Sequence, residues 1–357
     1  MAATRAGFAK SLLSWYDRER RDLPWRGQSD PYRVWISEAM LQQTVVATVI
    51  PYYQRFLRAF PTVQALARAP EGDVLHAWAG LGYYSRARSL KRAAQMVVEE
   101  FGGRMPATEA QLLRLPGVGP YTAAAVAAIA YGHHTFPLDG NAIRVMARLA
   151  NDDSFIDDDA TKQALRNVGQ ALVPRGRAGD FAQAVMDLGA RVCLPRTPKC
   201  DVCPVARFCE ARVQGTAKEL PRRRPRRPKK PVRLMCIAML CDDDVLLLQQ
   251  PSKGLLGGTW TLPSVTMADD EPVPAAALRI AASYGLRAQI QVSPSLVHHV
   301  FTHLDVKAHV ALVTLKAATK AKVSKAFPQA RWIPCADASS LPLASFTKKL
   351  LACVGAR

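Results

Sequence analysis

The sequence predicts a multidomain protein in which an all-α domain precedes a smaller α+β domain. Up to about residue 192, apolar residues recur at helical spacing and no alternating strand pattern appears. Residues 214–233 combine basic side chains with prolines, which favours an extended linker. After Leu234 the pattern changes to short strands separated by turns. We therefore expect domains at 1–212 and 233–357, joined by a linker at 213–232.

The individual elements follow from the same patterns. In the first domain we expect helices over 8–21, 32–44, 49–60, 61–69, 71–79, 86–101, 105–115, 157–173 and 179–192, and an Ala-rich helix that begins near Pro120 and ends at Gly132. In the second domain we expect strands over 235–241, 245–250, 296–302 and 306–315, and helices over 274–284 and 346–353.

Charge points to the kind of partner. Lys and Arg total 48 against 29 Asp and Glu, a formal net charge of +19. This excess favours a polyanion, nucleic acid before a membrane surface, although a basic proteome would also produce it. We see neither a signal-peptide pattern nor an apolar run long enough to cross a membrane. We expect a monomer in the cytoplasm of a bacterium, associated with the nucleoid.

The segment from Leu115 to Asn141 carries the strongest local pattern. It opens with Leu-Pro-Gly-Val-Gly at 115–119, where glycines permit a tight turn, and Pro120 suits the first position of the next helix. Free N–H groups at such a helix start can bind a phosphate. The alternative is a turn that only caps a core helix. Asp139 then places one carboxylate 18 residues beyond Tyr121.

The cysteines predict a metal centre. Four of them, Cys193, Cys200, Cys203 and Cys209, follow the spacing C-x6-C-x2-C-x5-C. Four thiolates on one short loop can each bind one iron of a cubane cluster. Zinc is the alternative, although four-cysteine zinc sites more often pair two C-x2-C knuckles. We interpret the others as buried apolar residues: Cys236, Cys241, Cys335 and Cys353.

Two further features have both a structural and a functional interpretation. Glu38 is an acid within an apolar helical turn, which suits a salt bridge or a solvated face as well as catalysis. Residues 80–86 (GLGYYSR) mix glycine, tyrosine and arginine. This mixture can wedge into stacked bases, or it can form a helix–helix turn with packed tyrosines.

Together, Glu38, the 115–119 hairpin, Asp139 and the cysteine loop resemble the helix-hairpin-helix DNA glycosylases that carry an iron–sulfur cluster. The stretches SEAMLQQT (37–44), LGYYSRA (81–87) and LDGN (138–141), with the second domain, are similar to the MutY-type adenine glycosylases. The resemblance implies a helix-hairpin-helix glycosylase domain, one [4Fe-4S] cluster on the four cysteines, and double-stranded DNA as partner.

The resemblance also implies catalytic roles. Glu38 would protonate adenine, and an ionised Asp139 would stabilise the resulting sugar cation through space or by a transient bond. Tyr121 and Asn141 would orient the attacking water and the carboxylates. Since a phenol cannot form the imine that a lysine forms at the Tyr121 position of the endonuclease III branch, we expect base removal without efficient strand cleavage.

The resemblance also implies DNA contacts in the first domain. Gln43 and Tyr83 would fill the gap left by an extruded base, and N–H groups of the hairpin would hold a phosphate, with a monovalent cation conceivable on its carbonyls. The residues expected at the DNA are Arg26, Gln42, Gln43, Leu81, Tyr83, Gly117, Val118 and Gly119.

The second domain resembles a Nudix fold that lacks the metal-binding acids. Aligned on Gly285, the positions of the paired acids fall on Ala282 and Ser283, so we expect no pyrophosphatase activity. Phe301, Thr302 and His303 stand where the family has Phe-Ser-His, and the resemblance implies recognition of 8-oxoguanine. The alternative is an ordinary turn between strands.

The leading hypothesis is therefore removal of adenine paired with 8-oxoguanine or guanine. An endonuclease III-like enzyme for oxidised pyrimidines is the nearest alternative, and Tyr121 and the second domain argue against it. A non-catalytic iron–sulfur protein that binds DNA is another, and the combination of Glu38 with Asp139 argues against that.

Overall fold

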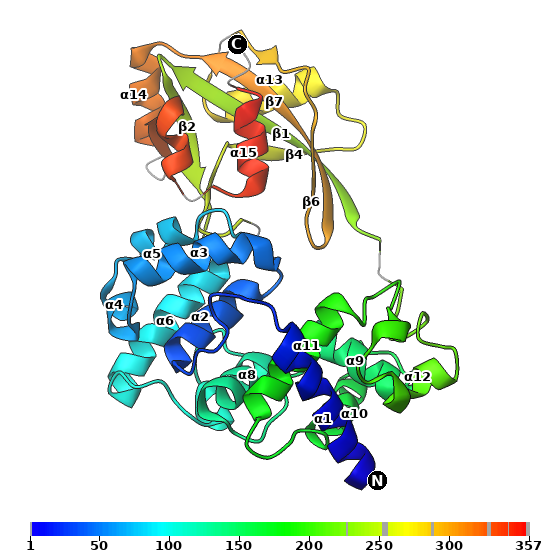
Figure 1. Ribbon diagram of the computed structural model, residues 1–357. Helices are drawn as coiled ribbons and strands as arrows, with labels where there is room; N and C mark the ends of the chain where they lie inside the picture. The colour runs from blue at the N-terminus through cyan, green and yellow to red at the C-terminus, as the bar shows by residue number, and fades with distance from the viewer. Residues whose placement is uncertain are drawn as a thin grey trace. The chain divides into compact units, whose positions relative to one another are not determined.

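The computed structural model describes residues 2–225, 228–251, 256–286, 289–326, 330–341 and 343–354. Contacts divide the chain into two compact units, Met1–Glu71 with Arg88–Pro225, and Gly72–Ala87 with Arg226–Arg357. Figure 1 shows helices through the first part of the chain and a sheet with flanking helices in the last part. The predicted fold class is confirmed.

The helical part contains the following elements. They are α1 Ala2–Glu19, α2 Pro31–Leu41, α3 Val46–Ala59, α4 Val63–Arg68, α5 Glu71–Trp78, α6 Tyr84–Phe101, α7 Glu109–Leu112, α8 Pro120–Tyr131, α9 Gly140–Ala150, α10 Asp159–Gln170, α11 Ala178–Arg191 and α12 Glu210–Val213, with short 3-10 turns at Cys200–Val202 and Ala206–Phe208. Within the described residues, no helix is long and apolar enough to cross a lipid bilayer.

Helix α9 is one of the elements that the sequence patterns failed to predict, together with α12, α14 (Ala317–Ala326) and the strands β3 (Trp260–Thr261), β4 (Ser264–Met267), β5 (Gln291–Val292) and β8 (Ala330–Pro334). Asp139 is the N-cap of α9 and accepts the Ala142 N–H, and Asn151 ends the helix in a left-handed conformation. Its apolar residues keep helical spacing, so the helix was overlooked although the pattern for it is present. What the pattern does not show is that Arg144 and Arg148 are buried, at 9 % and 1 % exposure.

Small residues bring α8 and α11 close together. Helix α8 buries the run from Thr122 to Ala128, and its low side-chain bulk leaves room for a neighbouring backbone. A Cβ added at Gly179, near the start of α11, would lie 2.8 Å from the Ala128 carbonyl oxygen and 2.9 Å from Ile129 Cα. The core of this unit also contains Phe8, Phe136 and Phe181.

The sheet part holds eight strands in the described residues. They are β1 Lys230–Cys241, β2 Asp244–Gln249, β3 Trp260–Thr261, β4 Ser264–Met267, β5 Gln291–Val292, β6 Val297–Val300, β7 Leu304–Thr314 and β8 Ala330–Pro334, with helices α13 Val273–Ser283, α14 Ala317–Ala326 and α15 Ser345–Ala352. The main strand order is β3-β2-β1-β7-β5, and the long central pair β1 and β7 is parallel from Lys230↔Leu304 to Leu240↔Thr314.

Alternating residues of β1 divide this part into two cores. Ile237 and Met239 pack on the side of α13, whereas Cys236 and Ala238 pack on the side of α15. Both faces of the central strands are therefore covered. Among the cysteines interpreted as buried, Cys236 and Cys241 are buried, but Cys335 is exposed because it begins a surface 3-10 turn.

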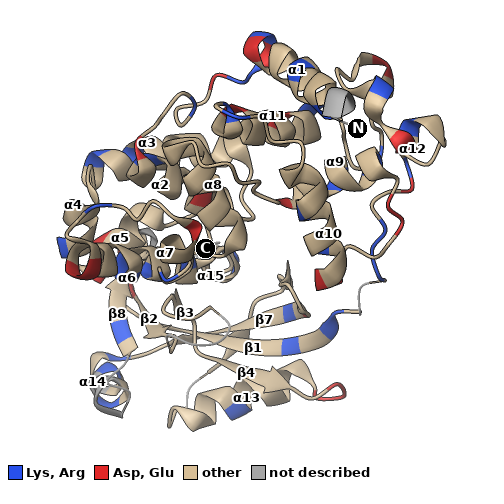
Figure 2. Ribbon diagram, turned by 90° about the horizontal axis from the view of Figure 1, so that it is seen from below, with Lys and Arg blue, Asp and Glu red and all other residues tan. Residues whose placement is uncertain are grey.

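The predicted linker is more ordered than its composition indicates. Strand β1 begins at Lys230, inside the predicted linker, and Figure 2 shows basic residues along it. Arg222 and Arg224 form ion pairs with Asp153 and Asp158, on the loop between α9 and α10. Both pairs are exposed, so they hold the arginines only weakly.

Close packing of α11 on α8 gives a first prediction. Gly179→Ala should lower the free energy of unfolding by about 1–3 kcal/mol, because the new methyl group meets backbone atoms that cannot move independently. Gly72→Ala is the control: nothing lies within 4 Å of its added Cβ in α5, so helix propensity should raise stability by about 0.5–1 kcal/mol. Denaturant unfolding measures both, and equal stability of Gly179→Ala and wild type would contradict this packing.

Candidate active site

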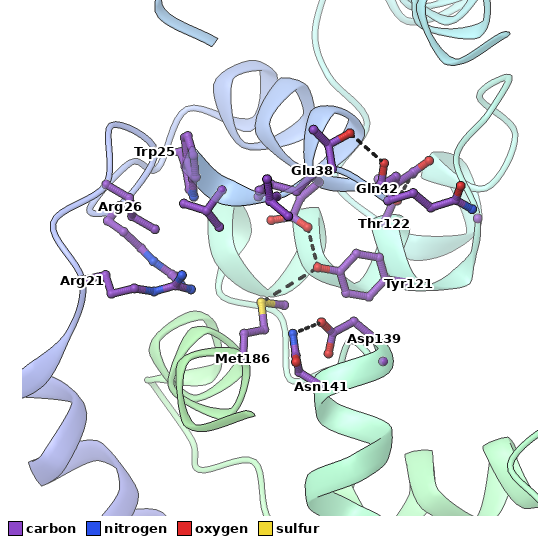
Figure 3. Close-up of a pocket in the computed structure, with 18 of the residues that line it drawn as sticks. Arg21, Trp25, Arg26, Glu38, Gln42, Tyr121, Thr122, Asp139, Asn141 and Met186 are labelled. Carbon is purple, nitrogen blue, oxygen red and sulfur yellow. Dashed lines mark hydrogen bonds between the residues drawn. The ribbon is translucent and has the colours of Figure 1, made fainter. Parts of the chain in front are cut away.

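A cavity of about 850 Å³ in the first unit collects the predicted catalytic residues. Glu38 comes from α2, Tyr121 from the start of α8, and Asp139 and Asn141 from the start of α9. Figure 3 shows their side chains directed toward the same space, with Met186 of α11 beside them. Residues separated by about a hundred positions in the sequence therefore share one site large enough for a nucleobase.

Glu38 lies in the apolar wall of this cavity at 4 % exposure. Its helix begins at Asp30, which accepts the Tyr32 N–H, and α2 then buries nearly every residue up to Met40. The Tyr121 hydroxyl donates to Glu38 Oε2 over 2.5 Å. Burial raises the pKa of Glu38, and the charge of Asp139 raises it further, while the Tyr121 hydrogen bond and Arg26 lower it.

Asp139 has a more polar environment. As the N-cap of α9 it accepts the Ala142 N–H over 2.7 Å, and the Asn141 amide donates to its Oδ2 over 3.0 Å. Burial raises the pKa of Asp139 above its ordinary value, although these two hydrogen bonds and the Arg144 charge oppose the shift. The helix N-terminus also favours an anion at this position.

The two carboxyl groups are therefore unequal acids. Asp139 accepts two hydrogen bonds from the start of α9 and lies near Arg144, whereas Glu38 accepts one hydrogen bond in an apolar wall. Because burial penalises both anions, a single proton favours the carboxyl group whose anion is less stabilised by its neighbours. We infer that Glu38 holds the proton and Asp139 the negative charge.

A chain of hydrogen bonds connects Asp139 to the cysteine loop. Arg144 donates to the Asn141 amide oxygen over 2.8 Å, to the Gly189 carbonyl over 2.7 Å and to the Cys193 carbonyl over 2.7 Å. Gly189 must lack a side chain, because a Cβ there would lie 2.6 Å from Asn141 Cβ. The orientation of Asn141 is thus fixed from both sides.

Two arginines in the opposite wall are bound from behind by a buried aspartate. Asp187 of α11 is fully buried and accepts hydrogen bonds from Arg21 Nε (3.0 Å) and from Arg26 Nη2 (2.7 Å). Arg26 also donates to Gln183. Its side chain is only 9 % exposed but lines the cavity, and the expected contact of Arg26 with DNA stays a prediction. Arg26 also lies close enough to Glu38 to lower its pKa.

The hairpin supplies part of the expected anion site. Gly117 has φ +80°, and a Cβ there would lie 2.6 Å from Ser89 Cβ, so glycine is required. The Val118 N–H donates to the Leu115 carbonyl and is not available to a phosphate, which corrects the expectation for Val118. Gly119, the N-cap of α8, and the first turn of α8 remain as the candidate anion site.

The expected base-stacking residues differ in accessibility. Gln43 is exposed with φ +58°, and Tyr83 is 51 % exposed with φ +49°. A non-glycine residue in this region costs about 1–3 kcal/mol and tends to occur at functional sites. Gln42 lines the cavity and donates to the Thr122 hydroxyl. Leu81 is only 6 % exposed and its apolar side chain packs inside, and its contact with DNA stays a prediction.

The four cysteines of the 193–209 loop are free and half-buried. Burial, with smaller contributions from charges on Cys193, Cys209 and Cys200, raises the pKa of the Cys203 thiol to about 11, which is consistent with four neighbouring sulfurs. Arg148 donates to Cys193 Sγ over 3.2 Å. Among the described residues, no three His, Cys, Asp or Glu side chains are arranged to hold a metal ion. A four-iron cluster spaces its thiolates more widely than one ion does, because each cysteine binds a different iron.

In the second unit, residues 301–303 form the turn between β6 and β7. Phe301 is half-buried, whereas Thr302 and His303 are exposed. Helix α13 ends at Ser283, where it exposes Ala282 and Ser283 in place of paired acids. The side chains that would bind a divalent cation in a Nudix hydrolase are therefore apolar or neutral here.

Sequence patterns did not single out several residues of the site. Gln183, Met186 and Asp187 lie on one turn of α11, and Arg144 lies on α9. In the sequence, the acid at position 187 cannot be distinguished from a surface acid of an amphipathic helix. The arginines near the start of the chain were an indirect signal, because buried arginines need an acidic partner such as Asp187.

The ion pairs of Asp187 give a second prediction. Asp187→Asn should lower the free energy of unfolding by about 3–5 kcal/mol, because Arg21 and Arg26 would keep their charges beside a neutral group. Asp17→Asn is the control: its pair with Arg177 is 41–49 % exposed, and its loss should cost less than about 1 kcal/mol. Denaturant unfolding compares them, and equal losses would contradict the role given to Asp187.

Comparisons with known proteins agree with this architecture. A family model described as "HhH-GPD superfamily base excision DNA repair protein" matches residues 36–171, and a NUDIX domain model matches residues 234–353. The chain is 35 % identical to an adenine DNA glycosylase of Homo sapiens, over 96 % of this chain and 73 % of that protein. It is 38 % identical to an adenine DNA glycosylase of Mus musculus, over 96 % and 77 %.

Among solved structures, a thermostable thymine-DNA glycosylase matches with 31 % identity and a TM-score of 0.53, over 60 % of this chain and 98 % of that one. That match supports the fold of the helical part, and the two relatives extend through the second part of the chain as well. The chain belongs to the adenine DNA glycosylase family.

Proposed function

We propose that the protein hydrolyses the N-glycosidic bond of adenine paired with 8-oxoguanine or guanine in double-stranded DNA. The observation that carries this proposal is the shared cavity that holds a Glu38 buried in an apolar wall and an Asp139 with two hydrogen-bond donors. Such a pair of unequal carboxyl groups suits the cleavage of a bond to a sugar.

Bond cleavage begins with proton transfer. Adenine is a poor leaving group as an anion, so Glu38 donates its proton to N7 of the base. The bond between C1′ and N9 then breaks, and its electron pair leaves with the neutral adenine. The deoxyribose becomes an oxocarbenium ion.

Asp139 stabilises that cation. Its carboxylate is held at the start of α9 by the Ala142 N–H and the Asn141 amide, so it does not have to reorient as positive charge develops. Water adds to C1′, and the proton that it loses goes to the Glu38 carboxylate, which restores the acid. Tyr121 positions Glu38 throughout, and its phenol cannot form an imine with the sugar.

DNA binding requires the adenine to leave the helix. Extrusion costs a few kcal/mol, and side chains that fill the vacated space reduce this cost. Gln43 and Tyr83 are exposed and have strained backbones, which supports a role for both in filling the vacated space. The N-terminus of α8 after Gly119 suits an adjacent phosphate.

A [4Fe-4S] cluster suits the four cysteines. Cys193, Cys200, Cys203 and Cys209 supply four thiols on one loop, and Arg148 supplies a buried positive charge that offsets the charge of a thiolate-bound cluster. When bound, the cluster joins the segments of the loop. Arg148 also donates to the carbonyls of Leu194 and Pro195, so the loop and α9 are held together.

The second domain, taken as residues 233–357 after a linker at 213–232, supplies recognition of the base opposite adenine. Undamaged adenine is abundant in DNA, so excision must depend on its partner. Thr302 and His303 are exposed on a turn and have side chains that donate and accept hydrogen bonds. Oxidation at C8 of guanine adds an acceptor oxygen and a donor N7–H, which such groups can distinguish.

Glu38→Gln tests the acid. This change keeps the shape but removes the proton, so base release from an A:8-oxoguanine duplex should fall by about 10²–10⁴-fold with little change in binding. Glu99→Gln, on the exposed side of α6, is the control and should retain activity. Single-turnover kinetics measure release, and full activity of Glu38→Gln would remove Glu38 from the mechanism.

A substrate panel tests the function as a whole. We expect fastest excision from A:8-oxoguanine, slower excision from A:G, and none from A:T or from thymine glycol. Gel separation of alkali-cleaved products measures each rate. Excision of thymine glycol instead of adenine would favour an endonuclease III-like enzyme, and binding without any excision would favour a non-catalytic protein.

A further inference from the structure

The turn between β6 and β7 is held by main-chain and lysine contacts. The Phe301 N–H donates to the Leu304 carbonyl over 2.8 Å, next to the antiparallel pair Val300↔Asp305. Lys229 Nζ donates to the Phe301 carbonyl over 2.7 Å, and the Lys230 N–H donates to the His303 carbonyl over 3.1 Å. The backbone of the turn is therefore fixed against the start of β1.

Three aromatic rings pack together below this turn. The ring centroids of His299 and Phe301 are 4.6 Å apart at 67°, and those of Phe301 and Phe346 are 5.5 Å apart at 72°. His299 and Phe346 are also 5.5 Å apart. Each ring thus contacts the other two, in geometries that are favourable for aromatic pairs.

Helix α15 anchors this cluster in the core. Phe346 is 3 % exposed and packs with Val297, Val306 and Leu350, residues of two strands and of α15 itself. From the same helix, Lys349 Nζ donates to the His298 carbonyl over 3.1 Å, which ties β6 to α15. Figure 1 shows the β6–β7 hairpin and α15 as neighbouring parts of this unit.

We propose that His299 and Phe346 form a seat that fixes the ring of Phe301, so that Phe301 positions the turn while Thr302 and His303 contact the base opposite adenine. His299, half-buried beside the turn, is then a positioning residue that sets the preference for the oxidised base. This inference rests on the proposed function, since it assigns recognition of that base to the same turn.

The division of roles follows from exposure. Phe301 is half-buried and contacts two rings of its own domain, which leaves it poorly placed to stack on DNA. Thr302 and His303 are exposed. Hydrogen bonds tolerate little displacement of their donors and acceptors. A turn without its seat should therefore still contact the base opposite adenine but distinguish 8-oxoguanine from guanine less well.

His299→Ala tests the seat, with His299→Phe as the conservative variant and His309→Ala as the matched control. His309 is also a half-buried histidine of this sheet, on β7. Single-turnover excision is measured on A:8-oxoguanine and A:G duplexes of one sequence. We expect His299→Ala to reduce the ratio of the two rates roughly tenfold, mainly through slower excision from A:8-oxoguanine, because two ring contacts are lost. His299→Phe and His309→Ala should keep the ratio of the wild type.

Three results would overturn the proposal, and they are distinguishable. If wild-type protein shows no preference for A:8-oxoguanine over A:G, the proposed function fails and the seat fails with it. If the wild type shows the preference and His299→Ala keeps it, the seat alone is wrong. If His299→Ala slows excision from both duplexes equally, the residue only stabilises the domain. Thermal unfolding of the full chain, expected to differ little between His299→Ala and His309→Ala, accompanies each assay.

Discussion

Burial of two carboxyl groups in one cavity governs this site, and the surrounding helices keep the two groups unequal. Glu38 is placed by α2 in an apolar wall, with the Tyr121 hydroxyl as its hydrogen-bond donor. Asp139 is placed at the first turn of α9, where backbone and side-chain donors favour its anion. If the two environments were alike, the proton would be shared and neither group would be a reliable acid or a reliable anion.

Buried arginines hold the helices that carry these groups. Arg144 joins Asn141 to the carbonyls of Gly189 and Cys193, so the start of α9, the end of α11 and the cysteine loop are fixed together. Arg26 is bound to Asp187 and contributes positive charge near Glu38. Such buried charges are expensive unless they are paired, and here each guanidinium is satisfied largely by carbonyl or carboxylate oxygens. The interior of this unit is consequently organised by polar contacts as much as by its apolar core.

Sequence patterns predicted the elements whose apolar faces have regular spacing. Helices such as α6 and α11, and the long strands β1 and β7, were predicted from periodicity, with ends displaced by a few residues. Helix α9 was overlooked although its apolar residues keep helical spacing, and the burial of its arginines follows only from the fold. The strands β3 and β5 have two residues each, too few to establish a period of two, and their positions depend on pairing with distant strands.

The site residues show the same limit of sequence patterns, which do not reveal contacts that only the fold creates. Glu38 and Asp139 were predicted because short motifs surround them, and the structure places both at one cavity. Asp187 was not predicted, since only the fold brings Arg21 and Arg26 to it from more than 150 positions away. For the same reason the accessibility of Arg26, Leu81 and the Val118 N–H could not be judged from sequence: each depends on a partner or a packing contact supplied by the folded chain.

The most direct test of the central claim is the pH dependence of single-turnover adenine release by wild type and Tyr121→Phe. If Glu38 must carry the proton, the rate falls on the alkaline side as Glu38 ionises, at a pKa above its ordinary value. The Tyr121 hydrogen bond lowers that pKa, so its removal should move the alkaline limb to higher pH. A limb that stays in place or moves to lower pH, or a rate that rises as Glu38 ionises, would contradict the account.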